Sequence, residues 1–134
     1  MAQAEDSDIP ACIDLLDACF GLQTGYMPAL WELKSDVKTG SLLCIKGDDG
    51  QLCGLLRWVA HPANIEVRLV AVREDVRGQK LSRRLLDAFT HKWGHKQNTI
   101  WMNDDNIAAQ KAYTAVGFAP DGWRSDVMLC KLTG

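Results

Sequence analysis

The stretch that decides the fold runs from residue 65 to residue 93 and reads IEVRLVAVREDVRGQKLSRRLLDAFTHKW. From Ile65 to Val72, every second residue is apolar. In an extended chain these side chains face the same side, which is typical of a β-strand. From Leu81 to Trp93, apolar residues recur with the spacing of one helix face. The stretch therefore predicts a central strand, a polar loop and a helix, in that order.

Two strands and a helix are expected on the carboxyl side of this stretch. Residues 99–103 predict a short strand, and two strands joined by a packed helix pair in parallel within one sheet. The alanine-rich segment 107–116 predicts a helix, and Gly117 is typical of a helix end that a left-handed glycine closes. A last strand is expected at about residues 125–132.

Two helices are expected near the amino end. Asp8 can cap a helix over about residues 8–20, in which apolar side chains recur on one face. A second helix can open at Pro28, because proline suits the first helical turn, and Gly40 can close it.

An antiparallel hairpin is expected between these helices and the central strand. Two mainly apolar segments, residues 42–45 and 52–59, flank the turn sequence Asp48-Asp49-Gly50-Gln51. Together with the parallel pair, the hairpin predicts an α+β fold with a central mixed β-sheet flanked by about four helices. Because the chain holds no repeat, low-complexity tract or linker, residues 1–134 are expected to form a single domain.

Composition and charge argue against several classes of protein. The chain is 47% apolar and 24% charged, which suits a soluble globular domain and not a disordered or fibrous chain. A net charge of -2 and a pI near 5.9 argue against nucleic acid or an anionic membrane as the main partner, and a cationic acceptor fits better. No apolar run approaches the roughly 20 residues of a membrane helix, and no signal-peptide pattern is present, so we expect a cytoplasmic protein.

The five cysteines are scattered and form no CxxC pair. Neither a disulfide framework nor a metal site is therefore expected, and we interpret the cysteines as small buried residues in a reducing compartment. The alternative is a nucleophilic cysteine that works with one of the three histidines, but no spacing supports it. The residues concerned are Cys12, Cys19, Cys44, Cys53, Cys130, His61, His91 and His95.

The polar loop between the central strand and the following helix is the first candidate binding site. The amino end of a helix presents N–H groups without partners in the helix and the positive end of the helix dipole, so it can hold a diphosphate. Gly78 lets the backbone approach a ligand closely, while Arg77 and Lys80 add positive charge. The alternative is an ordinary strand-to-helix turn with an exposed arginine and lysine.

Two stretches carry motifs that belong together. Arg77-Gly78 follows the apolar strand end Leu69-Val-Ala-Val72, and residues 106–118 read NIAAQKAYTAVGF. In this pairing the chain resembles the GNAT superfamily of N-acetyltransferases, whose diphosphate loop runs Arg-Gly-x-Gly-x-Gly/Ala and whose later helix runs Asn-x-x-Ala-x-x-x-Tyr-x-x-x-Gly-Phe. The similarity covers about residues 65–118 and implies a GNAT-like fold that binds acetyl-coenzyme A.

The sequence departs from the family pattern at two places. Lys80 and Ser82 stand where the family has glycine and then glycine or alanine. Because backbone N–H groups donate whatever the side chain is, the diphosphate site is retained if the helix start keeps its shape. Residues 1–5 leave little room for the family's first strand, which is therefore expected to be stunted or at the sheet edge.

The resemblance implies two catalytic residues. Glu66 lies where several family members carry a carboxylate that deprotonates the incoming ammonium, often through a water, so it is a candidate general base. The alternative is a surface glutamate paired with Arg68 on the same strand face. Tyr113 is the candidate general acid, because a phenol can protonate a departing thiolate or hydrogen-bond to it. The alternative for Tyr113 is a core aromatic whose hydroxyl lies at the rim.

The same resemblance implies the residues that bind the coenzyme. The main chain of Val70, Ala71 and Val72 is expected to pair with the pantetheine arm, as an added strand would. Asn106, two helical turns before Tyr113, faces the coenzyme with it, although a plain helix cap is the alternative for Asn106. The residues expected around the diphosphate are Arg77, Gly78, Gln79, Lys80, Leu81 and Ser82.

The activity implied by the resemblance is transfer of an acetyl group from acetyl-coenzyme A to a primary amine of a small molecule or peptide, by direct attack in a ternary complex and without a metal. The identity of the acceptor cannot be read from the sequence. Homodimers are common in the family, although no residue here indicates one. Two alternatives remain open, namely a GNAT-like module that binds acetyl-coenzyme A without turnover and a purely structural interaction domain.

Overall fold

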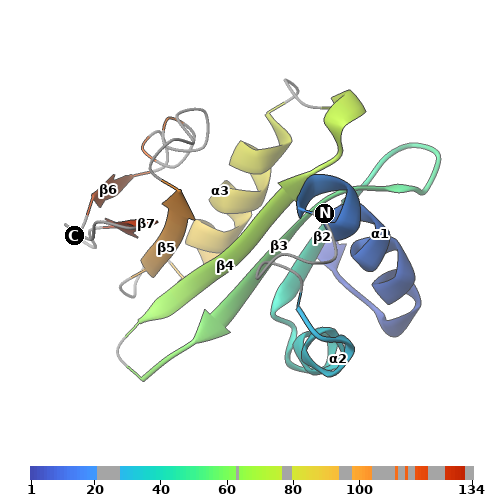
Figure 1. The fold of residues 1–134 in the computed structure, drawn as a ribbon, viewed down its shortest axis with the longest axis horizontal. Coiled ribbons are helices and arrows are strands. Elements are labelled where there is room, and N and C mark those ends of the chain that lie inside the picture. The colour runs from blue at the N-terminus through green and yellow to red at the C-terminus, as the bar shows by residue number, and fades with distance from the viewer. Residues whose placement is uncertain are drawn as a thin grey trace. The chain divides into compact units, whose positions relative to one another are not determined.

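The computed structural model describes residues 1–20, 28–62, 64–76, 80–93, 98–103, 111, 114, 117–120 and 126–131 (Figure 1). Its helices are α1 (Ile9–Phe20), α2 (Leu30–Thr39) and α3 (Leu81–Trp93), with short 3-10 turns at Asp6–Asp8 and Glu74–Val76. Its strands are β1 (Ala2–Gln3), β2 (Leu42–Lys46), β3 (Leu52–Ala60), β4 (Ile65–Val72), β5 (Asn98–Asn103), β6 (Phe118–Pro120) and β7 (Asp126–Lys131).

The strands hydrogen-bond in the order β1-β2-β3-β4-β5-β7-β6, and the sheet is mixed. β4 and β5 pair in parallel, whereas β1 with β2, β2 with β3, β5 with β7 and β6 with β7 pair antiparallel. The predicted α+β fold, the hairpin and the parallel pair are therefore confirmed. The two-residue strand β1 lies at the edge, as expected for the short amino end.

The chain divides into two compact units that are interleaved along the sequence. One unit comprises Met1–Arg57 and Leu69–Leu85, and the other comprises Trp58–Arg68 and Leu86–Gly134. Both β3 and β4 run from one unit into the other, so neither unit is a continuous piece of chain.

The core of the first unit is built by α1 and α2 together with strand residues. Leu16 of α1, Leu33 of α2 and Leu55 of β3 are completely buried in the same apolar cluster. This burial confirms the apolar face predicted for the first helix, whereas Leu30 and Trp31 of α2 are exposed. It also explains why the short helices are stable, because most helix stability in proteins comes from packing an apolar face. Gly40 ends α2 in a left-handed conformation with φ 74°, also as predicted.

The carboxylate of Asp8 is used differently from the helix cap that was expected. Its Oδ2 accepts the N–H of Glu5 at 2.9 Å and its Oδ1 lies 2.8 Å from Nζ of Lys46. Both carboxylate oxygens are engaged by these two partners. Asp8 therefore stabilises the 3-10 turn that leads into α1 and links this turn to β2.

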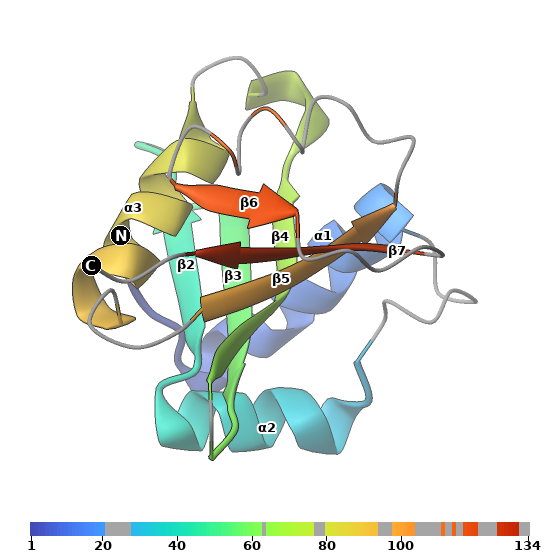
Figure 2. The ribbon, with the colours of Figure 1, turned by 90° about the vertical axis from the view of Figure 1, so that its left-hand side faces the viewer.

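In the second unit, β5, β7 and β6 form an antiparallel ribbon, shown side by side in Figure 2. The sequence did not predict β6, because a three-residue strand that ends in proline is too short to show a two-residue period. The ring of Trp58 packs against Phe89 and Trp93, with centroid distances of 5.9 and 6.4 Å. Nζ of Lys92 lies 5.3 Å from the Trp58 ring centroid and adds a cation–π contact.

Cys12, Cys44 and Cys53 are buried free thiols, and Cys19 is a half-buried free thiol. The interpretation of the cysteines as small buried residues is confirmed for Cys12, Cys44 and Cys53. A hydrogen bond with the Cys12 thiol and burial raise the pKa of Cys44, so this thiol stays protonated.

Neither a membrane span nor a metal centre is found in the described parts of the chain. In those stretches no helix has the length and apolar character needed to cross a membrane. Within the same ranges, no three His, Cys, Asp or Glu side chains are grouped so that they could hold a metal ion.

Candidate functional site

The carboxyl half of β4, where the pantetheine arm is expected, lies in the first unit. Ala71 and Val72 are buried and Val70 is half-buried, so the side chains of this segment belong largely to the core. The residue pairs described between β4 and β5 cover Ile65–Val67, and Val70 to Val72 lie beyond them along the strand. What this segment can offer a ligand is therefore its main chain.

The end of β4 is held closely by β3 on its other edge. The N–H of Arg73 donates to the carbonyl of Cys53 at 2.8 Å. A Cβ added at Gly54 would lie 3.3 Å from the carbonyl oxygen of Ala71 and 3.3 Å from a methyl carbon of Leu85. Glycine at this position thus lets strand and helix approach each other where the coenzyme segment begins.

The carbonyl of Val72 is also contacted by α1, because the thiol of Cys19 donates to it with an Sγ to O distance of 3.6 Å. A hollow of about 490 Å³ opens there, lined by Leu15, Ala18, Cys19, Arg73, Glu74 and Asp75. Nε of Arg73 lies 2.5 Å from Oδ1 of Asp75, and this hydrogen bond raises the pKa of Arg73. The first residues of the predicted coenzyme loop are thus fixed by an ion pair.

The residue directly before α3, Lys80, has a backbone conformation that residues other than glycine rarely adopt. Lys80 has φ 61°, in the left-handed region that favours glycine. Its carbonyl accepts the N–H of Arg84 at 3.0 Å, the first hydrogen bond of α3, while its side chain is exposed. Leu81 is buried and Ser82 half-buried. Lys80 therefore adopts the conformation that a glycine, the family's residue here, adopts readily.

Glu66 lies in the second unit, and its carboxylate is held at both oxygens. Oε1 lies 2.7 Å from Nε2 of His61 and Oε2 lies 3.3 Å from a guanidinium nitrogen of Arg68. The Glu66 side chain is 10% exposed, against 43% for His61 and 47% for Arg68. The pairing with Arg68 that belongs to the alternative interpretation is present, but Glu66 is far less exposed than the surface glutamate of that alternative.

The contact between His61 and Glu66 was missed by sequence reasoning, which considered His61 only as a partner for a cysteine. The N–H of His61 donates to the carbonyl of Asn64 at 2.8 Å, which closes the turn between β3 and β4. The turn reverses the chain, so His61 before it lies beside Glu66 after it. The sequence signal that could have predicted this contact was the separation of five residues across a predicted turn.

The remaining predicted site residues lie outside the described residues. The helix expected to carry two of them is described only at Lys111 and Thr114, which are helical, and at its end. There Gly117 has φ 102° and donates its N–H to Thr114 at 3.0 Å, so the predicted left-handed helix end is confirmed. The undescribed site residues are Arg77, Gly78, Gln79, Asn106 and Tyr113.

The comparison with known families defines the class of this protein. Residues 39–120 match the model of the acetyltransferase (GNAT) domain, which is more than half of the chain and includes β4, the loop after it and α3. The chain therefore belongs to the GNAT family of acetyl-coenzyme A-dependent N-acetyltransferases.

Solved structures with the same fold have low sequence identity to this chain. The ribosomal-protein-S18-alanine N-acetyltransferase from Escherichia coli is 16% identical with a TM-score of 0.74, over 99% of this chain and 92% of that chain. A phosphinothricin acetyltransferase from Sinorhizobium meliloti, solved in complex with AcCoA, is 15% identical with a TM-score of 0.78, over 98% and 86%.

The PaiA N-acetyltransferase from Thermoplasma acidophilum, in complex with coenzyme A, is 13% identical with a TM-score of 0.71, over 96% of this chain and 95% of that chain. At such identities these likenesses establish the fold and not the acceptor. A search of curated protein sequences finds no match.

Proposed function

We propose that this chain is a single-domain enzyme that transfers an acetyl group from acetyl-coenzyme A to a primary amine of a small molecule or peptide, with both substrates bound at once. The observation that carries the proposal is the family match over residues 39–120. It is supported by the backbone of Lys80, which has the left-handed conformation that a glycine would supply in the family's diphosphate loop.

In this proposal the diphosphate of the coenzyme binds at Arg77 to Gln79 and at the start of α3, Lys80 to Ser82. The N–H groups and the positive dipole end of the helix favour an anion there. The pantetheine arm pairs with the main chain of Val70 to Val72, beyond the stretch of β4 that pairs with β5. The two related folds solved with coenzyme A or AcCoA support this choice of ligand.

The chemistry begins with loss of a proton from the bound ammonium, which Glu66 accepts directly or through water. The amine lone pair then attacks the thioester carbonyl, which a main-chain N–H near Val72 can polarise. As the carbon–sulfur bond breaks, Tyr113 donates a proton or a hydrogen bond to the thiolate, while Asn106 lines the coenzyme on the same helix face. The products are the N-acetylated amine and free coenzyme A.

A non-catalytic module that binds acetyl-coenzyme A is the second candidate, because Lys80 and Ser82 replace the small residues of the family loop. Thiol release during incubation with acetyl-coenzyme A and a panel of amines, antibiotics and peptides separates the two. An acetyltransferase releases coenzyme A with at least one acceptor, and the acceptor gains an acetyl group by mass spectrometry. Calorimetric binding of acetyl-coenzyme A without release by any acceptor would favour the binding module.

Replacement of Tyr113 by phenylalanine tests the proposed general acid. Tyr113→Phe should lower kcat by roughly 10²-fold, because the thiolate then leaves without a proton donor. The Kd for acetyl-coenzyme A, measured by calorimetry, should change little, since the ring is retained. Unchanged kcat at saturating substrates would remove Tyr113 from the mechanism.

A further inference from the structure

Glu66 contacts two basic side chains, and the charge of one of them can change near neutral pH. In the described part of the chain, the charged or titratable groups that contact Glu66 are His61, from the turn after β3, and Arg68, from β4 itself. Arg68 keeps its charge at every working pH, whereas an imidazole gains and loses a proton near neutrality. The electrostatic environment of the Glu66 carboxylate therefore changes with the protonation of His61.

Within the ranges that the structure describes, the strands on either side of β4 carry no further group that titrates near neutral pH. Residues of β5 in register with the start of β4 are Asn98, Thr99 and Ile100, none of which ionises near neutral pH. On β3 the charged residue is Arg57, which is already engaged by Asp36 and Glu32. Among the described residues, His61 is thus the group through which pH can act on Glu66.

We infer that His61 is a positioning residue that orients the Glu66 carboxylate and that, by gaining a proton, switches off its action as the general base. The inference rests on the proposed function, in which Glu66 takes the proton of the ammonium. Neutral His61 donates Nε2–H to Oε1 and holds the carboxylate in place. Protonated His61 places a full positive charge at the same 2.7 Å contact.

The sign of the effect follows from the proton transfer itself. The ammonium N–H bond breaks, its electron pair stays on nitrogen, and the proton forms an O–H bond with a carboxylate oxygen of Glu66, which later returns it to water. A positive charge beside a carboxylate favours its ionised form and weakens its affinity for a proton. Turnover should therefore fall when His61 gains a proton.

Two variants of His61 separate orientation from charge. His61→Gln keeps an N–H donor but stays neutral, so kcat at pH 8 should remain within about threefold of wild type, while the acidic limb of its pH profile moves down by roughly one unit or more. His61→Ala removes the donor and should lower kcat at pH 8 by about tenfold, because a misplaced base works poorly. His91→Gln, at an exposed histidine of α3, is the matched control and should follow the wild-type profile.

The assay uses acetyl-coenzyme A with the most active amine of the panel, and Glu66→Gln tells the two hypotheses apart. If Glu66→Gln retains wild-type turnover, the general-base role in the proposed function is wrong. If Glu66→Gln loses turnover but His61→Gln keeps the acidic limb of the wild type, only the role of His61 is wrong. Wild-type protein that releases no thiol with any amine overturns the proposed function and this inference with it.

Nuclear magnetic resonance gives a readout that does not depend on turnover. In the wild type, Nε2 of His61 lies 2.7 Å from Oε1 of Glu66, so the ring nitrogen chemical shifts of His61 should change in Glu66→Gln. The ring nitrogen shifts of His91 should be the same in both proteins. Unchanged His61 shifts would show that the two side chains are not in contact and would overturn the inference.

Discussion

At the scale of single residues, the backbone of Lys80 has an unfavourable left-handed conformation. A residue with a Cβ in the left-handed region is destabilised by roughly 1–2 kcal/mol relative to the right-handed one, because Cβ crowds the neighbouring carbonyl. Lys80 nevertheless has φ 61° directly before α3, and its side chain is exposed. Strain at this place is consistent with a binding function, since ligand-binding loops often hold such conformations.

Replacement of Lys80 by glycine should relieve this strain. Lys80→Gly is expected to raise the free energy of unfolding by about 1 kcal/mol, measured by urea denaturation, because glycine has no Cβ to clash. Lys80→Ala keeps the Cβ and is the matched control, for which no such gain is expected. A similar gain in both variants would mean that the lysine charge, and not the backbone, is responsible.

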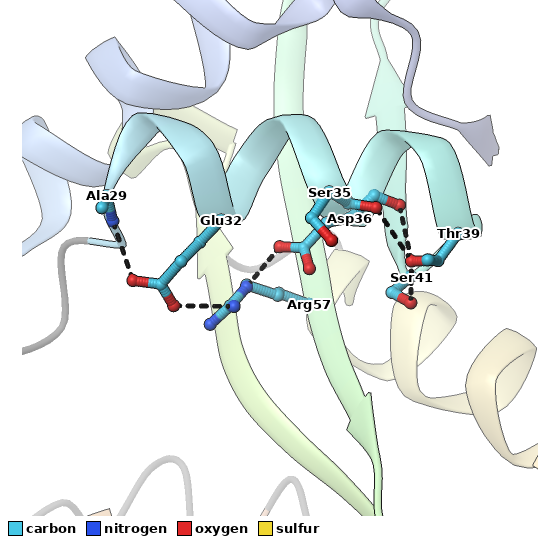
Figure 3. Close-up of polar contacts among 7 residues, drawn as sticks. All are labelled: Ala29, Glu32, Ser35, Asp36, Thr39, Ser41 and Arg57. Atoms are coloured by element: carbon cyan, nitrogen blue, oxygen red, sulfur yellow. Dashed lines mark hydrogen bonds and ion pairs between the residues drawn. The ribbon is translucent and has the colours of Figure 1, made fainter.

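Among the secondary-structure elements, α2 is tied to β3 by buried charges (Figure 3). The Arg57 side chain is 8% exposed, its Nε donates to Asp36, and its terminal nitrogen lies 3.1 Å from Oε2 of Glu32. The other oxygen of Glu32 accepts the N–H of Ala29 at 3.1 Å and so caps the start of α2. A buried arginine requires such partners, because an unpaired charge in the interior is strongly unfavourable.

Removal of one partner from this cluster should destabilise the protein markedly. Asp36→Ala is expected to lower the free energy of unfolding by about 3 kcal/mol, because Arg57 then stays buried with less compensation. Glu32→Ala, at a more exposed carboxylate, should cost about 1 kcal/mol. Urea unfolding of both variants measures the difference. If Asp36→Ala cost no more than Glu32→Ala, Arg57 would have to reach solvent.

The link between the 3-10 turn before α1 and β2 predicts a dependence of stability on pH. The Lys46 ammonium, followed by the Glu5 N–H, lowers the pKa of Asp8. A carboxyl whose folded pKa is depressed contributes stability that is present above its ordinary value of about 4 and is lost as pH falls through the folded pKa.

Asp8→Asn should therefore lower the melting temperature at pH 7, and the difference from the wild type should shrink toward pH 3. Melting curves at pH 7, 5 and 3 measure this trend. Asp14→Asn, at an exposed carboxylate of α1, is the control and should give little difference at pH 7. A difference for Asp8→Asn that is as large at pH 3 as at pH 7 would contradict the ion-pair explanation.

At the scale of the whole molecule, the two compact units share strands β3 and β4. Because each of these strands contributes residues to both units, neither can unfold alone without disrupting a strand of the other. We therefore expect one cooperative transition, with equal calorimetric and van't Hoff enthalpies. Acetyl-coenzyme A at 100 times its Kd should stabilise this transition by about 2.7 kcal/mol. Two separate transitions would contradict the proposed single domain.

Much of the fold could be predicted because its signals are local. The alternation in Ile65–Val72 and the helical spacing up to Trp93 reflect which side chains face the core, and Gly40 marks a backbone that only glycine adopts easily. The residues proposed to bind the coenzyme were likewise chosen from motifs in short stretches. The short strand β6 could not be predicted, because it is defined by its pairing with β7 and not by a local pattern.

By itself, the sequence determined the family and the order of the helices and of the strands other than β6, since periodicity, turn residues and motifs are properties of neighbouring positions. Tertiary structure alone decided the partners of the buried Arg57. Its guanidinium binds Asp36 and Glu32 of α2, which lie 21 and 25 residues away in the chain. Spacing along the chain gives no signal for contacts over such separations, because a hydrogen bond depends on distances in space that the whole fold must first create.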